Sequence, residues 1–202
     1  MPHYCIRGEV PHKRHTQFKK PKGGLYSEQL VSTEGFSSVY SLIYHGHPPT
    51  IVTEIDEPVD VSPKIDIMKN MRHRCYKGFD IHSEADFLKS RKPVLINNDV
   101  HIVLAAPQKS MTDYFYKNSD ADEVIFVHEG TGSVRTIFGE LKFEYGDYIV
   151  IPRGIIYQIS FDTEKNRLLI IESFSPVVYP KKYRNEISAM NNAVLSMNFT
   201  EK

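Results

Sequence analysis

The sequence predicts an all-β fold made of short antiparallel strands, on three observations. Between residues 141 and 145, Leu141, Phe143 and Tyr145 alternate with Lys142 and Glu144, the period-2 pattern of a half-buried strand. A Gly-Glu pair precedes this segment and a Gly-Asp pair follows it, and such pairs are typical of turns. The chain also contains 12 Tyr and 11 Phe without a Trp, and aromatic side chains of this kind are favoured in strands.

The segment from residue 51 to residue 92 is less regular. Pro58 and Pro63 indicate a loop or the edge of a sheet, where proline is tolerated. Four loosely alternating apolar residues suggest an edge strand here, namely Val59, Val61, Ile65 and Ile67. In the segment 83–88 we expect a short helical turn capped by Ser83, because acidic residues follow directly after it.

Further strands are expected between residues 94 and 161. Residues 94–96 and 100–105 predict a hairpin around Asn97-Asn98-Asp99, since Asn and Asp tolerate the positive φ that such turns need. Residues 148–151 and 155–161 predict two more strands on either side of a Pro-Arg-Gly turn.

The C-terminal part of the chain changes character after residue 171. The apolar run Leu168–Ile171 suits a strand that is covered on both faces. In residues 187–202, apolar residues at helical spacing are interrupted by Asn, which indicates a marginal helix or a frayed tail. The expected organisation is an arm with edge strands packing on a barrel (1–92), the barrel itself (93–180), and a divergent tail (181–202).

The turn residues of the second half resemble the two motifs of the cupin barrel, a small antiparallel jelly roll. The first motif ends in Glu, six residues and Gly, a spacing met by Glu123 and Gly130. The second, Gly-(Asp)-x4-Pro-x-Gly-x2-His, is met up to its last position by Gly146, Asp147, Pro152 and Gly154. The resemblance implies a cupin-like double-stranded β-helix with an N-terminal arm of irregular strands.

The histidines that bind metal in cupins are absent at the corresponding positions. These positions hold Tyr116, Asn118 and Tyr157, or, with a shorter gap in the first motif, Lys117 and Ser119. A single carboxylate is a poor site for iron, which is held by several imidazole and carboxylate groups. We therefore expect Glu123 to be a solvated or salt-bridged strand residue, in a degenerate barrel without metal.

Other histidines offer weaker alternatives. His45 and His47 would lie on one face of a strand and, with Glu54, could form another iron site. The two prolines that follow favour a polar loop held against the core. His101 and His128 have no partner at ligand spacing and are interpreted as structural.

Composition is that of an ordinary globular domain, with 202 residues of which 41% are hydrophobic and 25% charged. Lys and Arg total 25, as do Asp and Glu, so charge predicts no nucleic-acid or membrane partner; basic residues between positions 13 and 22 suggest a solvated loop more than an anion site. We expect a cytoplasmic protein, because we find no signal peptide and no apolar run of ~20 residues. Cys5 and Cys75 lack Cys-x-x-Cys spacing and are interpreted as reduced thiols.

Ordered motifs along residues 1–186 resemble homogentisate 1,2-dioxygenase. They include Gly8-Glu9-Val10-Pro11, Gly23-Gly24-Leu25-Tyr26, Tyr44-His45-Gly46-His47-Pro48-Pro49, Asn97-Asn98-Asp99-Val100, Pro152-Arg153-Gly154 and Phe174-Ser175-Pro176. This family cleaves the ring of homogentisate with O2 and Fe(II) to maleylacetoacetate, in tyrosine and phenylalanine catabolism, and assembles into trimer-based oligomers.

The resemblance places this chain in the N-terminal half of the family. The family's iron ligands, two His and one Glu, and its catalytic His lie in a second, C-terminal cupin that has no counterpart here. The expectation is a structural domain that is inactive alone, without catalytic, cofactor-binding or metal residues, and that forms homo-oligomers. Its interface is expected to involve Phe143, Tyr145, Tyr148 and the tail residues Met190, Val194 and Met197. The alternative is a free-standing, metal-free cupin that binds a small ligand or a protein partner.

Overall fold

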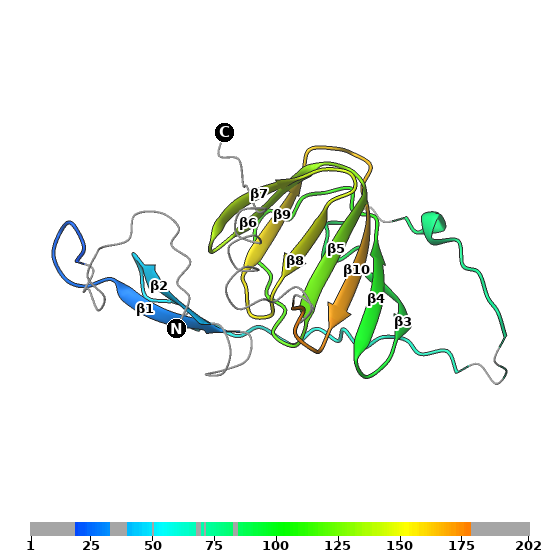
Figure 1. Cartoon of the computed structure of the whole chain (residues 1–202), viewed down its shortest axis with the longest axis horizontal. Coiled ribbons are helices and arrows are strands. Elements are labelled where there is room, and N and C mark those ends of the chain that lie inside the picture. Colours follow the sequence, from blue (N-terminus) through cyan, green and yellow to red (C-terminus); the bar gives the residue numbers. More distant parts are fainter. Residues whose placement is uncertain are drawn as a thin grey trace, which may run out of the picture. The chain divides into compact units, whose positions relative to one another are not determined.

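The computed structural model describes residues 19–32, 40–49, 51–67, 70, 72–82 and 85–178 of the chain. The chain divides into two compact units, and the second comprises Thr33–Gly35 and Ile55–Val177. The described part of the first unit is a hairpin in which β1 (Ser27–Ser32) pairs antiparallel with β2 (Tyr40–His45). The second unit contains eight strands and is the part of the molecule that carries the candidate site (Figure 1).

Two antiparallel sheets make up the second unit. The larger has, in spatial order, β3 (Lys92–Ile96), β4 (Val100–Ala105), β10 (Arg167–Ser173), β5 (Asp122–Glu129) and β8 (Tyr148–Ile151). The smaller has β7 (Gly139–Phe143), β6 (Gly132–Thr136) and β9 (Tyr157–Phe161). The predicted all-β, cupin-like jelly roll is thereby confirmed. A 3-10 turn at Gly78–Asp80 is the one helical element of the described residues, so none of their helices could cross a membrane.

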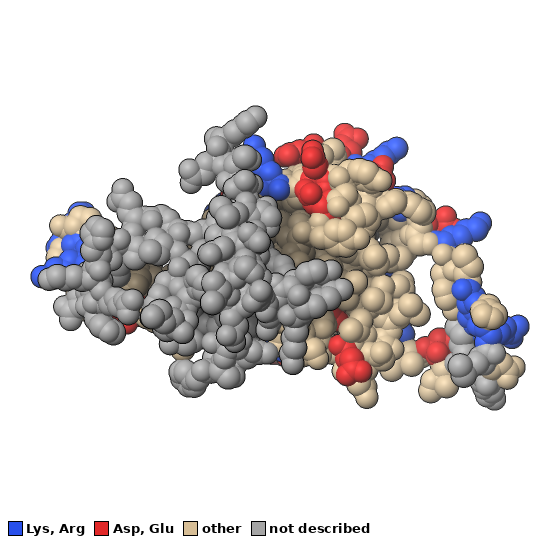
Figure 2. Space-filling model, in the orientation of Figure 1, with Lys and Arg blue, Asp and Glu red and all other residues tan. Residues whose placement is uncertain are grey.

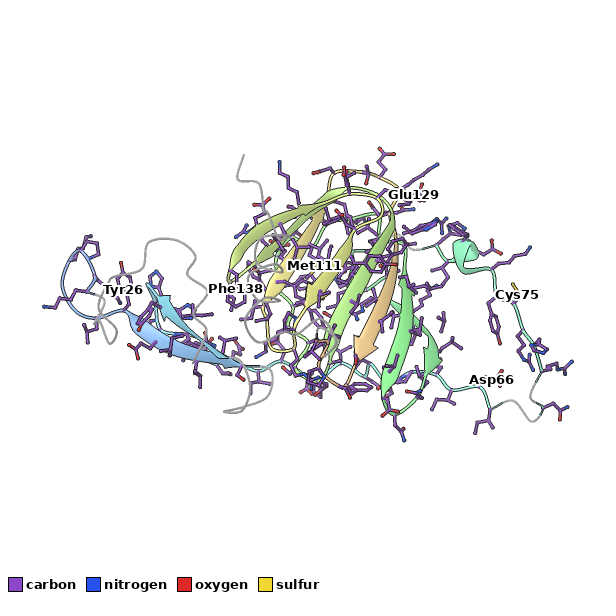
Figure 3. All side chains as sticks on the ribbon, in the orientation of Figure 1. Tyr26, Asp66, Cys75, Met111, Glu129 and Phe138 are labelled. Carbon is purple, nitrogen blue, oxygen red and sulfur yellow. The ribbon has the colours of Figure 1, made fainter. Side chains whose placement is uncertain are left out.

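The core lies between the inward faces of the two sheets. From the larger sheet, Ile125, Val127 and Ile170 are at most 1% exposed, as are Val134 and Ile159 of the smaller one. Met111 precedes β5 and points into the same space, whereas Phe138 and Glu129 lie at the periphery (Figure 3). Each such side chain stabilises the fold by roughly 1.5–3 kcal/mol relative to exposure.

Several predicted elements are confirmed. The hairpin is β3 and β4, and at its turn Asn97 Oδ1 accepts the N–H of Asp99 at 2.8 Å and of Val100 at 2.7 Å. The strands predicted at 148–151 and 155–161 correspond to β8 and β9, and the run Leu168–Ile171 lies within β10. An amide side chain that caps its own turn is why this hairpin could be recognised from sequence.

Two expectations about residues 51–92 differ from the structure. Residues 51–67 form no strand, and Val59 and Ile67 are 81% and 86% exposed. Pro58 and Pro63 lack the N–H groups that a strand would need, and apolar alternation alone does not supply a partner. The described turn of this region lies at 87–90, later than expected, and there Asp86 Oδ1 accepts the N–H of Lys89 at 3.0 Å. Ser83, and all residues from 179 onward, lie outside the described part of the chain.

Gly130 of the first motif is required by both conformation and space. Its φ is +114°, and a Cβ at this position would lie 2.2 Å from Asn166 Oδ1. Asn166 cannot retreat easily, because it is 3% exposed and its Nδ2 donates to Pro107 O at 3.0 Å and Thr163 O at 2.9 Å. The glycine therefore allows the end of β5 to pack against the turn before β10.

We expect Gly130→Ala to lower the free energy of unfolding by roughly 3 kcal/mol, combining a strained φ with a clash in a filled site. Gly139→Ala is the matched control, since its φ is +121° but a Cβ would meet no atom within 4 Å. It should cost only the strain, about 1–2 kcal/mol. Urea unfolding measures both variants, and equal losses would show that the contact with Asn166 contributes nothing.

Candidate functional site

Two carboxylates lie side by side on the inward face of the larger sheet. Glu123 of β5 and Glu172 of β10 are directly opposite in the antiparallel register, and His101 of β4 is opposite Glu172 on its other side. The Glu123 side chain is 0% exposed and that of Glu172 16%. Like charges directly opposite in a sheet repel, and burial strengthens that repulsion. The arrangement therefore requires a cation.

Arg91 supplies that positive charge from the residue just before β3. Its side chain is 8% exposed, and Nη1 lies 2.7 Å from Glu123 Oε1. Nη1 makes an ion pair with Glu123 but no hydrogen bond. Nη2, in contrast, donates a short hydrogen bond to Glu172 Oε1. One guanidinium thus bridges the buried carboxylate of Glu123 and the partly buried carboxylate of Glu172, which come from neighbouring strands.

Polar side chains complete the coordination of the carboxylates. The Tyr157 hydroxyl donates to Glu123 Oε2 at 2.6 Å, and Asn118 Nδ2 lies 3.4 Å from both Glu123 Oε1 and Glu172 Oε1. His101 Nδ1 is 3.4 Å from Glu172 Oε2. Asn118 is held in place because its Oδ1 accepts the N–H groups of Asp120 and Ala121 at 3.1 and 3.0 Å. We call Arg91, Glu123, Glu172, Asn118 and Tyr157 the charged centre.

Aromatic rings enclose the guanidinium. The Arg91 Cζ atom lies 5.4 Å from the centre of the Phe87 ring and 5.6 Å from that of Tyr116, within range of cation–π attraction. The rings of Tyr116 and Tyr157 meet edge to face at 5.5 Å. The centre is consequently shielded from water, which strengthens its electrostatic interactions.

The environment keeps the phenols protonated and the guanidinium charged. Burial, with the nearby Glu123 charge, raises the pKa of Tyr157 well above its ordinary value. Burial also raises the pKa of Tyr116 to about 12. For Arg91, burial alone would lower the pKa, but the charges of Glu123 and Glu172 raise it overall. At neutral pH both tyrosines are therefore protonated, and Tyr157 acts as a neutral donor to Glu123.

A tight turn positions Arg91. Asp86 O accepts the N–H of Ser90 at 2.9 Å, and Ser90 Oγ donates to Phe87 O at 3.1 Å. Phe87 and Ser90 are both 0% exposed. The turn is anchored to the segment before β5, because Gln108 N donates to Ala85 O at 3.0 Å. Arg91 thus extends from a rigid, buried support.

A second buried ion pair fixes the loop after β8. Arg153 donates to Asp122 Oδ1 through both its backbone N–H and Nε at 3.0 Å, and through Nη2 to Phe174 O at 3.1 Å. Asp122 is 2% exposed and also accepts the N–H of Val177 at 2.7 Å. The Pro-Arg-Gly and Phe-Ser-Pro segments quoted from the sequence meet here, in a structural role.

The structure brings together the positions that sequence comparison with cupins assigned to the metal site. The charged centre includes Asn118, Glu123 and Tyr157, and Tyr116 packs on its arginine. Lys117 and Ser119, assigned with the shorter gap, are exposed. Glu123 is salt-bridged, as one of the two expectations had it, but it is fully buried and not solvated. The longer gap is therefore the correct one.

The other histidines of the described residues do not gather into a site. His45 ends β2 and its Nε2 is 2.7 Å from Gln29 Oε1, whereas His47 is exposed beyond the strand and Glu54 is exposed. His128 packs on the Phe79 ring with centres 4.9 Å apart. Among the described residues, no three His, Cys, Asp or Glu side chains are placed to hold a metal ion.

Sequence reasoning missed Arg91 and Glu172. A weak signal for Glu172 exists, because a carboxylate directly follows the apolar run of β10 at an inward position of the period-2 pattern. Arg91 lies in an irregular segment 32 residues before Glu123, and the sequence offers no signal that pairs them. Only the fold brings them into contact.

The opposite side of the larger sheet is apolar as well. Two cross-strand rows form an outer apolar face, with members Ile102, Ile171, Val124, Val150 and Leu104, Leu169, Phe126, Tyr148. Tyr148 and Val150 are 68% and 48% exposed. In the view of Figure 2, the described surface over β4, β5 and β10 carries few charges, and these gather at the strand ends.

The other residues expected at an interface have different environments. Tyr145 is exposed, whereas Phe143 is buried because its side of β7 faces the core. The tail residues lie outside the described part of the chain.

A pocket of about 510 Å³ lies at one corner of this outer apolar face. The segment Tyr76–Ile81 forms one wall, and Leu104, Phe126 and Leu169 form another. Arg167 Nη1 ties that segment to the sheet by donating to Phe79 O at 2.7 Å. The pocket is mainly apolar, and its charged or ionisable lining residues include Lys77, Asp80, His128 and Arg167.

Two antiparallel sheets that share one core, with a charged centre closed by arginine, define a cupin-type barrel of modified interior. Cupin-type structures resemble it at low identity, among them a cupin-2 domain protein of Shewanella frigidimarina (23% identical, 47% of this chain and 87% of that one, TM-score 0.40). Another is a double-stranded β-helix protein of Klebsiella pneumoniae (13%, 50% and 90%, TM-score 0.43).

The chain belongs to the homogentisate 1,2-dioxygenase N-terminal family, which matches residues 5–182. It is 36% identical over 188 residues to a Saccharolobus solfataricus protein described as a dioxygenase, covering 92% of this chain and 48% of that protein. It is also 36% identical over 173 residues to homogentisate 1,2-dioxygenase of Dictyostelium discoideum, covering 78% and 40%. The chain thus spans about half the length of these relatives.

We expect Tyr157→Phe to lower the free energy of unfolding by about 1.5–3 kcal/mol, because a buried carboxylate loses its shortest neutral donor. Tyr148→Phe removes the same hydroxyl from a residue that is 68% exposed, and should change stability by less than about 0.5 kcal/mol. Thermal or urea unfolding at neutral pH compares the two. Similar effects would mean that the Tyr157 hydrogen bond does not support Glu123.

Proposed function

We propose that this chain acts as the N-terminal, non-catalytic half of a homogentisate 1,2-dioxygenase, the enzyme that cleaves the ring of homogentisate with O2 and Fe(II). The family match over residues 5–182 carries this proposal. The charged centre supports it, since the positions where a cupin would hold a metal carry neutral phenols, an amide and one carboxylate, and that carboxylate is paired with Arg91. In this proposal the barrel provides structure, and the iron chemistry belongs to another part of the assembly.

The donor set of the charged centre does not suit Fe(II). Iron in dioxygenases is held by imidazole and carboxylate groups that leave coordination positions open. Here Glu123 and Glu172 are already bonded to a fixed cation, and Tyr157 is protonated. A divalent ion would have to displace Arg91 from its enclosure and leave a second positive charge beside it, which electrostatic repulsion opposes.

The outer apolar face is the part of the barrel that we propose packs on the catalytic half. Its eight residues come from four adjacent strands and lie in two cross-strand rows of aliphatic and aromatic side chains. Domain interfaces typically bury ~600–1,500 Å², and apolar patches beyond a few hundred Å² usually mark contacts with another domain or chain. The relatives are about twice as long as the matched region, so a partner domain exists in them.

A free-standing barrel that binds a ligand is the second candidate, and the pocket at the corner of the outer apolar face favours it. Its volume of about 510 Å³ lies in the range of small-molecule sites. The two functions differ in an observable way. A ligand-binding barrel functions alone, whereas the proposed half-enzyme needs its partner.

The isolated chain is expected to show no ring cleavage. Oxygen uptake with homogentisate and Fe(II) should equal that of a no-protein control, because the charged centre has no open metal position. A chimera in which this chain replaces the matched segment of the Dictyostelium discoideum enzyme should restore uptake. Sustained turnover by the chain alone would contradict the proposal, as would an inactive chimera that folds and retains iron.

We expect Val150→Lys to reduce self-association of the isolated chain, because it places a charge in the outer apolar face. Val61→Lys is the matched control, since Val61 is 84% exposed and lies outside any strand. Light scattering over a dilution series, with an apolar dye as a second readout, compares the variants. If the unaltered chain is a concentration-independent monomer that binds no dye, the outer apolar face is not a docking surface.

A further inference from the structure

The charged centre has the composition of a cation site in which the cation is part of the chain. Two carboxylates from adjacent strands converge on one position, and an amide and a phenol hold them there. Aromatic rings of Phe87 and Tyr116 stand 5.4 and 5.6 Å from the guanidinium carbon. Planar cations with several N–H donors fit such a site, because they pair with carboxylates and stack on rings.

We infer that Arg91 is the resident cation of a guanidinium-binding site at the position where a cupin holds its metal. The arginine closes the native site to metal ions. Without it, the site would accept a free guanidinium ion, because the carboxylates and rings that bind the group are fixed by other contacts. Glu123 and Glu172 are held by the sheet register, and Asn118 is held by its own turn.

Removal of the arginine side chain provides the first test. Arg91→Ala leaves two carboxylates opposite each other without a cation, so we expect its melting temperature to fall by roughly 10 °C. Arg135→Ala is the control for loss of an arginine, since Arg135 is exposed. Arg91→Lys retains the charge without the planar group and should fall between the native chain and Arg91→Ala.

Rescue by a small molecule is the second test and is specific to a binding site. Millimolar guanidinium chloride, far below the molar concentrations that unfold proteins, should raise the melting temperature of Arg91→Ala. The same concentration of urea or sodium chloride should not, and the native chain should not respond to any of them. Failure of guanidinium to rescue a folded Arg91→Ala would overturn the inference, as would equal rescue by urea or sodium chloride.

A double variant keeps the inference testable if Arg91→Ala does not fold. Arg91→Ala with Glu123→Gln removes the repulsion together with the cation, so it should be more soluble and more stable than Arg91→Ala. It should also lose the response to guanidinium. A double variant that is no better than the single one would show that Arg91 acts through packing alone, and would overturn the inference.

The native chain supplies the last measurement. After loading with Fe(II) and desalting, it should retain no stoichiometric iron, because Arg91 occupies the site. Near-stoichiometric iron that disappears in Glu123→Gln would overturn the inference. These experiments use the isolated 202-residue chain and make no use of ring cleavage, so their outcome is independent of the proposed half-enzyme role.

Discussion

The repulsion between Glu123 and Glu172 is the constraint that shapes this barrel. Their register puts two carboxylates side by side in the core, and a buried pair of like charges costs several kcal/mol unless a cation is close to both. Arg91 meets that requirement, and the turn that begins at Asp86 positions its side chain between the two carboxylates. The conformation of an otherwise irregular segment is therefore linked to the interior of the sheets.

Order differs along the second unit. The segment 85–91, which carries the arginine, is largely buried and hydrogen-bonded, whereas residues 51–67 are largely exposed and form no strand. A second ion pair, Arg153 with Asp122, involves the residue next to Glu123 and fixes the same end of β5 to the loops that follow β8 and β10. Two charge pairs at the start of β5 thus hold neighbouring loops against the core.

A sheet with two apolar faces needs two layers to cover it. The inward face of the larger sheet is covered by the smaller one, and the outer apolar face carries rows of aliphatic and aromatic residues at the same period. This is the physical basis for the proposal that another domain packs on the outer apolar face. The larger sheet thus carries a charged centre buried on its inward side and a partly exposed apolar face on its outer side.

The sequence by itself determined the strands, because turn residues and period-2 alternation act locally. Asn97 caps the hairpin, and Gly130 and Gly146 adopt positive φ values that other residues rarely adopt. It also determined that no histidine occupies the cupin metal positions, which hold Tyr157 and either Tyr116 and Asn118 or Lys117 and Ser119. Alternation failed at Val59 to Ile67, since a strand needs a partner that local pattern does not supply. Only the tertiary structure decided that Glu123 is buried and paired, because its partners Arg91 and Glu172 come from distant segments that the sheet order alone brings together.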